Sequence, residues 1–229
     1  MQLKTELYLN QKKRWQPRGK VILAQYDVDS IVVYQAYRPS IGHFAAQHGY
    51  FGGDFKLSRM TWIKPNFLWM MYRSGWGTKK DQEVTLAIRI QRSAFDTILA
   101  QAVHSKYIPE IYQNQQAWSQ AVKRSDVRLQ WDPDHTPTGE KVERRAIQLG
   151  LQGETGIKYS QEWIMNIEDI SEFVAEQRQH LISQNYDALL TPREYPYEVN
   201  NLEIARRLQL SVCIPQAEQE DLNHEHSQN

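Results

Sequence analysis

The residues with the clearest chemical potential are flat aromatic rings placed beside basic side chains. The chain has seven Trp and twelve Tyr, and many of them stand among Arg, Lys and Pro rather than in aliphatic runs. Amphipathic packing explains many such rings, because Trp and Tyr often bury the ring and keep a polar tip in water. Together they also suggest a pocket that stacks flat ligands, with neighbouring cations that bind phosphate. The candidates are Tyr34, Tyr37, Trp62 and Tyr72 as rings, and Arg38, Arg59, Lys64, Arg73 and Arg144 as cations.

Two further groups combine residue types with possible chemistry. Asp132, Asp134 and His135 have the chemistry of metal ligands, but the prolines on either side favour a turn-forming loop over a metal site. The tandem Arg144–Arg145 stands inside a folded block. This placement indicates that one of the two is buried, either in an ion pair with an acid or against a bound anion.

The elements that must position these residues mix strands and helices without a regular βαβ alternation. The segment 31–37 is β-branched and aromatic, which predicts a strong strand. The segment 83–91 alternates between apolar and polar residues, which predicts a half-buried strand. The segment 66–73 is apolar on nearly every face, which predicts a buried helix. Further expected elements are strands over 21–26, 59–64, 127–131 and 162–167, helices over 39–48, 93–103, 108–122 and 169–183, a loop over 132–139, and a strand or helix over 143–151.

Composition and motifs narrow the function classes. Lys plus Arg and Asp plus Glu number 27 each, so no global field attracts nucleic acid or an anionic membrane. The first residues are charged where a signal peptide would be apolar, and no apolar run approaches the ~20 residues that span a bilayer. Cys213 is the single cysteine, which fits a reducing compartment. No Gly-x-Gly-x-x-Gly follows a strand and no Walker motif occurs, which argues against Rossmann and P-loop enzymes.

We therefore expect a cytoplasmic α+β protein with no membrane partner. Residues 1–20 are predicted to form an irregular arm, and 21–200 a single catalytic or ligand-binding domain. Residues 201–215 would be a C-terminal extension, and the polar segment 216–229 a disordered tail.

Several long blocks resemble a known family. They are Ile31-Val-Val-Tyr-Gln-Ala-Tyr37, Arg59-Met-Thr-Trp-Ile-Lys-Pro65, Phe67-Leu-Trp-Met-Met-Tyr-Arg-Ser-Gly-Trp76, Trp131-Asp-Pro-Asp-His135 and Arg144-Arg-Ala-Ile-Gln-Leu-Gly-Leu151. On these blocks the chain is identified as a member of the DUF4291 family, a domain of unknown function. The resemblance covers residues 15–200 and implies no established activity.

The order of elements also resembles the catalytic core of ADP-ribosyltransferases. That core begins with a strand bearing a polar-aromatic signature and a helix that ends in Gly, to which Tyr34-Gln-Ala-Tyr-Arg38 and the helix up to Gly49 are similar. A later strand carries the catalytic Glu of such enzymes, and the segment around Glu162 looks like that strand. The chain departs from the pattern because Gln35 and Ala36 stand in place of His-Gly or Arg-Gly, and because the second strand has no Ser-Thr-Ser.

The second resemblance implies a mixed or antiparallel split sheet with flanking helices, and an enzyme of the ADP-ribosyltransferase type that uses NAD as substrate and needs no metal. Glu162 and Gln35 would be catalytic, with Glu162 stabilising the oxocarbenium-like charge that develops on the ribose. A plain alternative for Glu162 is an exposed acid at a strand end. The acceptor, a protein or a nucleic acid, stays open. The implied cofactor-binding residues are Tyr34, Tyr37, Arg38, Trp62, Lys64, Tyr72 and Arg73.

Two other interpretations fit the same residues. In a non-catalytic nucleotide- or RNA-binding module, the rings stack bases and Arg59, Lys64, Arg73 and Arg144 contact phosphate, although zero net charge argues somewhat against a nucleic-acid binder. In the other, the chain is a structural or regulatory partner protein that binds no ligand.

Overall fold

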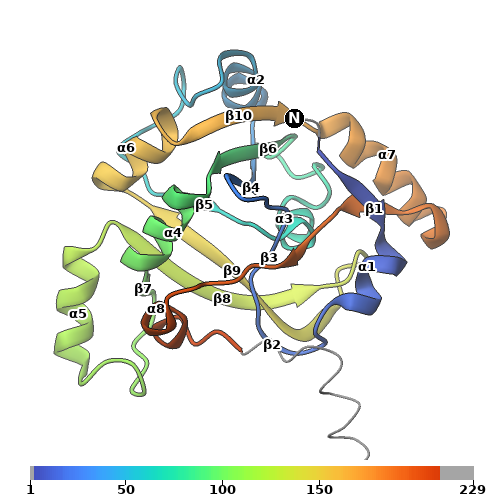
Figure 1. Cartoon of the computed structure of the whole chain (residues 1–229). Coiled ribbons are helices and arrows are strands. Elements are labelled where there is room, and N and C mark those ends of the chain that lie inside the picture. Colours follow the sequence, from blue (N-terminus) through green and yellow to red (C-terminus); the bar gives the residue numbers. More distant parts are fainter. Residues whose placement is uncertain (1–2, 212–229) are drawn as a thin grey trace, which may run out of the picture.

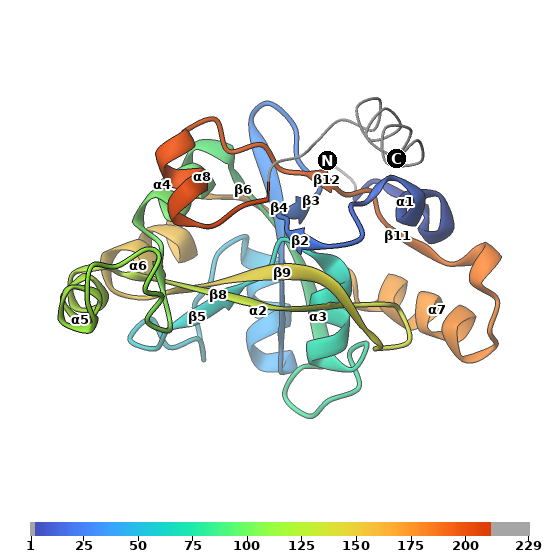
Figure 2. The ribbon, with the colours of Figure 1, turned by 90° about the horizontal axis from the view of Figure 1, so that it is seen from below.

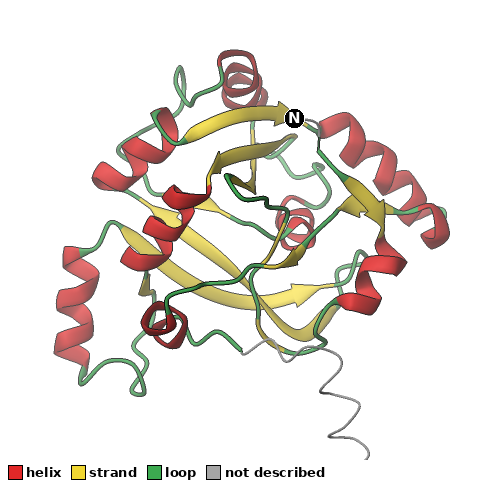
Figure 3. Cartoon of the chain, viewed as in Figure 1, coloured by secondary structure: helices red, strands yellow, loops and turns green. Residues whose placement is uncertain are grey.

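A computed structural model describes residues 3–211, which form an α+β arrangement of two larger sheets and two short strand pairs with helices around them (Figures 1 and 3). The first sheet has three antiparallel strands in the order β10-β6-β4, and β6 is central. These strands are β4 (Ser30–Tyr37), β6 (Val84–Gln91) and β10 (Ile164–Asp169).

The second sheet is built around two long antiparallel strands, β8 and β9. On the outer side of β8 lies β7, and on the other edge of β9 lie β2 and β5. The strands are β2 (Gly19–Lys20), β5 (Thr61–Ile63), β7 (Val103–His104), β8 (Val127–His135) and β9 (Lys141–Leu151). An isolated antiparallel bridge between Tyr34 of β4 and Lys64 beside β5 connects the two sheets.

The helices surround the sheets, and Figure 2 shows α5 and α7 at opposite ends of the molecule with α2 and α3 between them. Their bounds are α1 (Tyr8–Arg14), α2 (Pro39–His48), α3 (Phe67–Ser74), α4 (Arg92–Gln101), α5 (Gln115–Arg124), α6 (Gly153–Gln161), α7 (Ser171–Ile182) and α8 (Leu202–Arg207). Short antiparallel pairs join β1 (Thr5–Leu7) to β11 (Leu190–Pro192) and β3 (Leu23–Ala24) to β12 (Tyr195–Pro196), and a 3₁₀ turn spans Tyr186–Ala188.

Local sequence explains where α2 and α3, the helices that follow β4 and β5, begin and end. Pro39 stands in the first turn of α2, and Gly49 ends that helix in the left-handed conformation with φ of 77°. The Asn66 side chain accepts a hydrogen bond from the Trp69 amide at 2.7 Å, which caps the start of α3. Gly75 ends α3 with φ of 59°.

Strand β6 corrects the expectation of a half-buried strand. Leu86, Ile88 and Ile90 are buried as the alternation predicts, but Thr85 and Arg89 on the opposite side are buried too. Since β6 is the middle strand of its sheet and other elements cover both faces, its polar side chains find partners inside the protein. Arg89, for example, donates to Ser30 Oγ at 2.6 Å.

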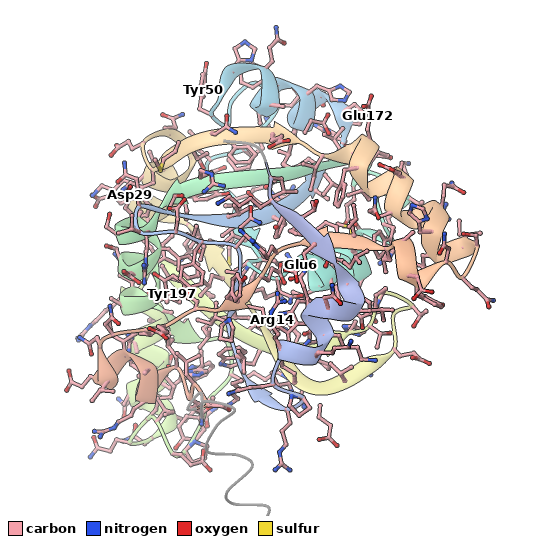
Figure 4. The ribbon with its side chains drawn as sticks, turned by 45° about the vertical axis from the view of Figure 1, so that its right-hand side comes forward. Glu6, Arg14, Asp29, Tyr50, Glu172 and Tyr197 are labelled. Atoms are coloured by element: carbon pink, nitrogen blue, oxygen red, sulfur yellow. The ribbon has the colours of Figure 1, made fainter. Side chains whose placement is uncertain are left out.

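The N-terminal segment is not the irregular arm that its polarity suggested. It forms β1 and α1, and Arg14 of α1 makes two hydrogen bonds of 2.6 and 2.8 Å to the Glu6 carboxylate of β1 (Figure 4). Strand β1 pairs with β11, and this pairing holds the segment in place. No local sequence pattern predicts the pairing.

Other boundaries also differ from the sequence expectations. Strand β8 continues through Asp132 to His135, where a loop was expected, and the ambiguous segment 143–151 belongs to strand β9. Helix α5 begins at Gln115 rather than near residue 108. The disordered tail expected over 216–229, like Cys213, lies outside the described residues.

Candidate functional site

A cavity of about 530 Å³ opens where the ends of β4 and β5 face α3. This volume lies within the range of about 300–1,000 Å³ that is usual for small-molecule sites. Its wall is completed by the loop before β5 and by the turn before β6. The lining residues are Gln35, Ala36, Tyr37, Arg38, Ile41, Asp54, Phe55, Lys56, Arg59, Met60, Thr61, Trp62, Lys64, Met70, Arg73, Asp81 and Gln82.

Three elements bring the main polar groups together. Strand β4 supplies Gln35 and Tyr37, which lie two residues apart and so face the same side of the strand. Helix α3 supplies Met70 and Arg73, which lie three residues apart and so share one helix face. Residue Trp62 comes from β5, where it pairs with a glycine of β9.

Gln35 is the centre of a hydrogen-bond network in the cavity wall. Its side-chain nitrogen donates to Thr61 Oγ1 at 2.6 Å and to Tyr37 Oη at 2.8 Å, and Tyr37 Oη lies 2.7 Å from Thr61 Oγ1. Its side-chain oxygen accepts a hydrogen bond of 2.7 Å from the Tyr159 hydroxyl of α6. Burial raises the pKa of Tyr37 and of Tyr159, so both phenols stay neutral. Because its hydrogen-bonding capacity is used in this network, Gln35 is suited to orienting Tyr37 and Thr61.

The charges around the cavity are mostly positive. Five basic residues line it, namely Arg38, Lys56, Arg59, Lys64 and Arg73, against the two acids Asp54 and Asp81. Arg38 and Asp54 form an exposed ion pair at 3.2 Å, which leaves the other cations in excess.

Lys64 differs from the other cations because it is buried, with only 6% of its surface exposed. Burial, and after it the nearby Arg73 charge, lower the pKa of its amine to about 8, while Asp132 opposes the change. Within residues 3–211 its amine makes no hydrogen bond or ion pair.

Six of the nine residues that the ADP-ribosyltransferase resemblance implied line the cavity wall, namely Gln35, Tyr37, Arg38, Trp62, Lys64 and Arg73. Arg59, a further candidate cation, lines it as well. Tyr34, Tyr72 and Glu162 are not part of the lining. Tyr34 alternates to the other side of β4, where it is fully buried and its ring packs edge-on against Phe67 at 5.5 Å. Tyr72 is 40% exposed and stacks on His135 with 3.5 Å between ring centroids.

Glu162 does not start a strand. Its amide still donates to the Lys158 carbonyl at 2.8 Å, so Glu162 is the C-terminal cap of α6, and β10 begins two residues later at Ile164. Its side chain is exposed. The sequence had suggested the strand position because Trp163 and Ile164 are apolar, but the helix over 153–161 was not anticipated.

Sequence reasoning missed several lining residues, namely Asp54, Phe55, Lys56, Met60, Asp81 and Gln82. Most lie in loops that carry no periodic pattern, and only their position beside the ends of predicted strands could have suggested them. Tyr159 was missed for a different reason, since its helix was not predicted.

A second group of buried polar residues lies on the β8–β9 side of α3. Arg144 donates to the Asp134 carboxylate at 2.6 and 2.8 Å, and both residues are buried. This confirms that one arginine of the tandem pair is buried against an acid. Glu194 lies near this pair and accepts a hydrogen bond of 2.6 Å from the Phe67 amide at the start of α3. Burial raises the pKa of Glu194 well above its usual range.

The Asp132-Pro-Asp-His135 segment is used within the fold. Asp132 accepts hydrogen bonds from the side chains of Gln130 and Gln148, and Asp134 is paired with Arg144. Among residues 3–211 no group of three or more His, Cys, Asp or Glu side chains could hold a metal ion. Nor does this part of the chain contain a helix long and apolar enough to cross a membrane.

The fold and the cavity define an α+β protein with one predominantly basic, partly aromatic cavity at the junction of two sheets. The family model described as Domain of unknown function (DUF4291) matches residues 21–197, and the chain belongs to that family. A search of curated proteins finds no match.

Proposed function

We propose that the cavity binds a phosphate-bearing nucleotide and that NAD is the ligand to test first. The observation that carries this proposal is the combination, in one cavity, of aromatic rings with an excess of basic side chains. Nucleotides offer both a flat base and negative phosphates, so a site for them needs both types of group.

The arginines support the phosphate part of the proposal. Arg59 and Arg73 are exposed in the cavity wall and make no ion pair among the described side chains. A guanidinium forks around phosphate oxygens with two parallel hydrogen bonds, which a single ammonium cannot do. Arg38 would add a third guanidinium, but its pair with Asp54 must first be broken or shared.

The rings support the base part. Trp62 is half-buried and lines the cavity, so part of its surface is open to a ligand. The Tyr37 ring packs edge-on against Phe51 and Phe55, with centroid distances of 5.6 and 5.9 Å. Its hydroxyl is fixed by Gln35. Rings held in place in this way lose little freedom when a base stacks on them.

The finer proposal is that the chain is an ADP-ribosyltransferase-like protein that transfers the ADP-ribose of NAD to an acceptor. Its support is the order of elements together with the six predicted residues that line the cavity. Such chemistry needs a carboxylate beside the ribose. Since Glu162 is exposed outside the lining, the carboxylates available in the wall are Asp54 and Asp81. Nucleotide binding therefore has more support than catalysis.

Calorimetric titration with NAD, ADP-ribose and a short single-stranded RNA tests the proposal. We expect NAD and ADP-ribose to bind, and Arg73→Gln to weaken both about tenfold or more, as for the loss of one charge-assisted hydrogen bond. Arg124→Gln is the matched control, because Arg124 is also an exposed arginine in the last turn of a helix but lies outside the cavity. Binding of the RNA without any response to either nucleotide would refute the proposal and favour the RNA-binding alternative.

A further inference from the structure

Lys64 occupies a rigid position at the junction of the two sheets. Its carbonyl accepts a hydrogen bond of 2.7 Å from the Tyr34 amide, and its own amide donates to the Tyr34 carbonyl at 3.3 Å. Pro65 follows and favours an extended backbone at Lys64. Asn66 then caps α3. The backbone of Lys64 is thus fixed on both sides, and its side chain enters the cavity from a defined point.

The amine of Lys64 has no partner within the protein. The residue as a whole is only 6% exposed and lines the cavity, and its amine makes no hydrogen bond or ion pair among residues 3–211. The carboxylate that acts on its pKa, Asp132, already accepts hydrogen bonds from Gln130 at 3.0 Å and Gln148 at 2.7 Å. A largely desolvated lysine whose amine has no carboxylate partner is costly to keep charged, so this environment favours the neutral amine.

The neighbouring charge with the largest effect on this pKa, Arg73, acts in the same direction as burial, and Asp132 opposes it. Arg73 on α3 adds a positive charge beside the amine, and burial together with this charge lowers the pKa of Lys64 to about 8. About one-tenth of the amine is then neutral at pH 7, roughly three hundred times the fraction for an ordinary lysine. The other charged groups around it are Asp132 on β8 and, in the cavity wall, Arg38, Asp54, Lys56, Arg59 and Asp81.

We propose that Lys64 is a nucleophile that forms an imine with the free aldehyde of a phosphorylated sugar or nucleotide-sugar bound in the cavity. A desolvated lysine next to another cation is a known way to make an amine reactive at neutral pH. The arginines of the wall would hold the phosphate, which brings the sugar carbonyl to the buried amine. This inference rests on the proposed nucleotide site and specifies the reactive group within it.

The reaction balances without an oxidant or reductant. The neutral Nζ attacks the carbonyl carbon, the carbonyl π electrons move to oxygen, and a proton passes from nitrogen to that oxygen. The carbinolamine then loses its hydroxyl with the remaining nitrogen-bound proton as water, and a carbon–nitrogen double bond forms.

A matched pair of ligands tests the proposal. ADP-ribose has a free reducing end, whereas in NAD the same carbon is bonded to nicotinamide. The full-length protein is incubated with each ligand, treated with sodium borohydride and digested, and the modified lysines are found by mass spectrometry. We expect ADP-ribose to modify Lys64 at least tenfold faster than exposed Lys56 in the same cavity wall, and NAD to give no adduct unless nicotinamide is first released from it.

Two controls distinguish the reactivity of the Lys64 amine from nucleotide binding in the cavity. Pyridoxal 5′-phosphate, a phosphorylated aldehyde without a nucleotide, should also modify Lys64 first, with a rate that rises with pH around 8. Lys64→Arg keeps the positive charge but removes the nucleophile, and its circular dichroism and melting temperature report whether it folds.

The outcomes are distinguishable. If ADP-ribose binds by calorimetry and neither aldehyde modifies Lys64 faster than Lys56, the proposal that Lys64 is a nucleophile is refuted and the nucleotide-binding proposal is kept. If neither nucleotide binds but pyridoxal phosphate modifies Lys64 selectively, the proposal of a reactive Lys64 amine is kept and the nucleotide-binding proposal is refuted. Equal modification of Lys64 and Lys56 at every pH overturns the proposal.

Discussion

Trp62 and Trp69 provide the sharpest test of the boundary between cavity and core. Trp69 is only 5% exposed and stacks on His135 and Tyr72, with centroid distances of 5.4 and 5.5 Å. Replacing it by Ala removes a large buried ring, so we expect Trp69→Ala to lower the free energy of unfolding by about 3–5 kcal/mol. Trp62 is half-buried, so Trp62→Ala should cost about 1–2 kcal/mol.

Binding should respond in the opposite order. Trp62 lines the cavity, and the loss of one ring that stacks on a base weakens binding by about 1–3 kcal/mol, or about 5- to 150-fold in Kd. Trp69 is outside the lining, so its variants should change the Kd less than threefold once the unfolded fraction is taken into account. Trp69→Phe keeps a ring in the stack and shows whether any effect on binding comes from movement of α3.

Urea denaturation and calorimetric titration of the same four proteins, wild type included, measure both quantities. The reasoning depends on the two effects separating. If Trp62→Ala destabilises the protein as much as Trp69→Ala and leaves the nucleotide affinity unchanged, then Trp62 is a core residue and the assigned cavity wall is wrong.

Three further predictions concern groups around the cavity. Arg144→Met leaves the buried Asp134 carboxylate unpaired and should lower the free energy of unfolding by about 3–5 kcal/mol in urea, with Asp134→Leu in the same chain restoring much of it. Glu194 has a raised pKa in the native state, so its contribution to stability is complete below pH 4.5 and is lost as pH rises towards the native pKa. The free energy of unfolding, measured in urea between pH 4 and 8, should therefore fall less steeply with pH in Glu194→Gln than in the wild type. Glu162→Gln should change nucleotide affinity less than twofold by calorimetry, and a larger loss would place the exposed Glu162 at the ligand after all.

The sequence predicted the elements whose signals are local. The β-branched run of β4, the alternation of β6 and the Asn66 and Gly75 boundaries of α3 each act within a few residues, and each was found close to its observed position. The mixed α+β class followed from these elements.

Elements that depend on distant partners were missed. Helix α1 and strand β1 look like a polar arm until β11, more than 180 residues away, pairs with β1. The same limit explains Arg144 and Asp134. The sequence predicted a buried arginine, but its acid could be chosen only once β8 and β9 were paired in register.

The sequence predicted most of the residue types in the candidate site, but only partly which residues face the cavity. Six predicted residues share the cavity because β4, β5 and α3 follow one another closely, and strand alternation decides which rings face it. That alternation separates Gln35 from Tyr34, which sequence analysis had placed together. Glu162 was selected for the apolar residues that follow it. In the structure Glu162 caps the C-terminus of α6, and the apolar residues that suggested a strand do not indicate that a helix ends there.

The cavity itself follows from how the two sheets meet. Between β4 and β5 the backbones pair at Tyr34 and Lys64. Beyond this bridge, β4 continues to Tyr37 beside β6, while β5 runs along β9, so the two strands belong to different sheets. Gln35 spans the opening gap by bonding Thr61 across it, and α3 closes one side. A ligand in this gap contacts both sheets at once. Because a ligand that binds only the folded protein stabilises it by mass action, we expect occupation of the cavity to raise the melting temperature of the whole protein.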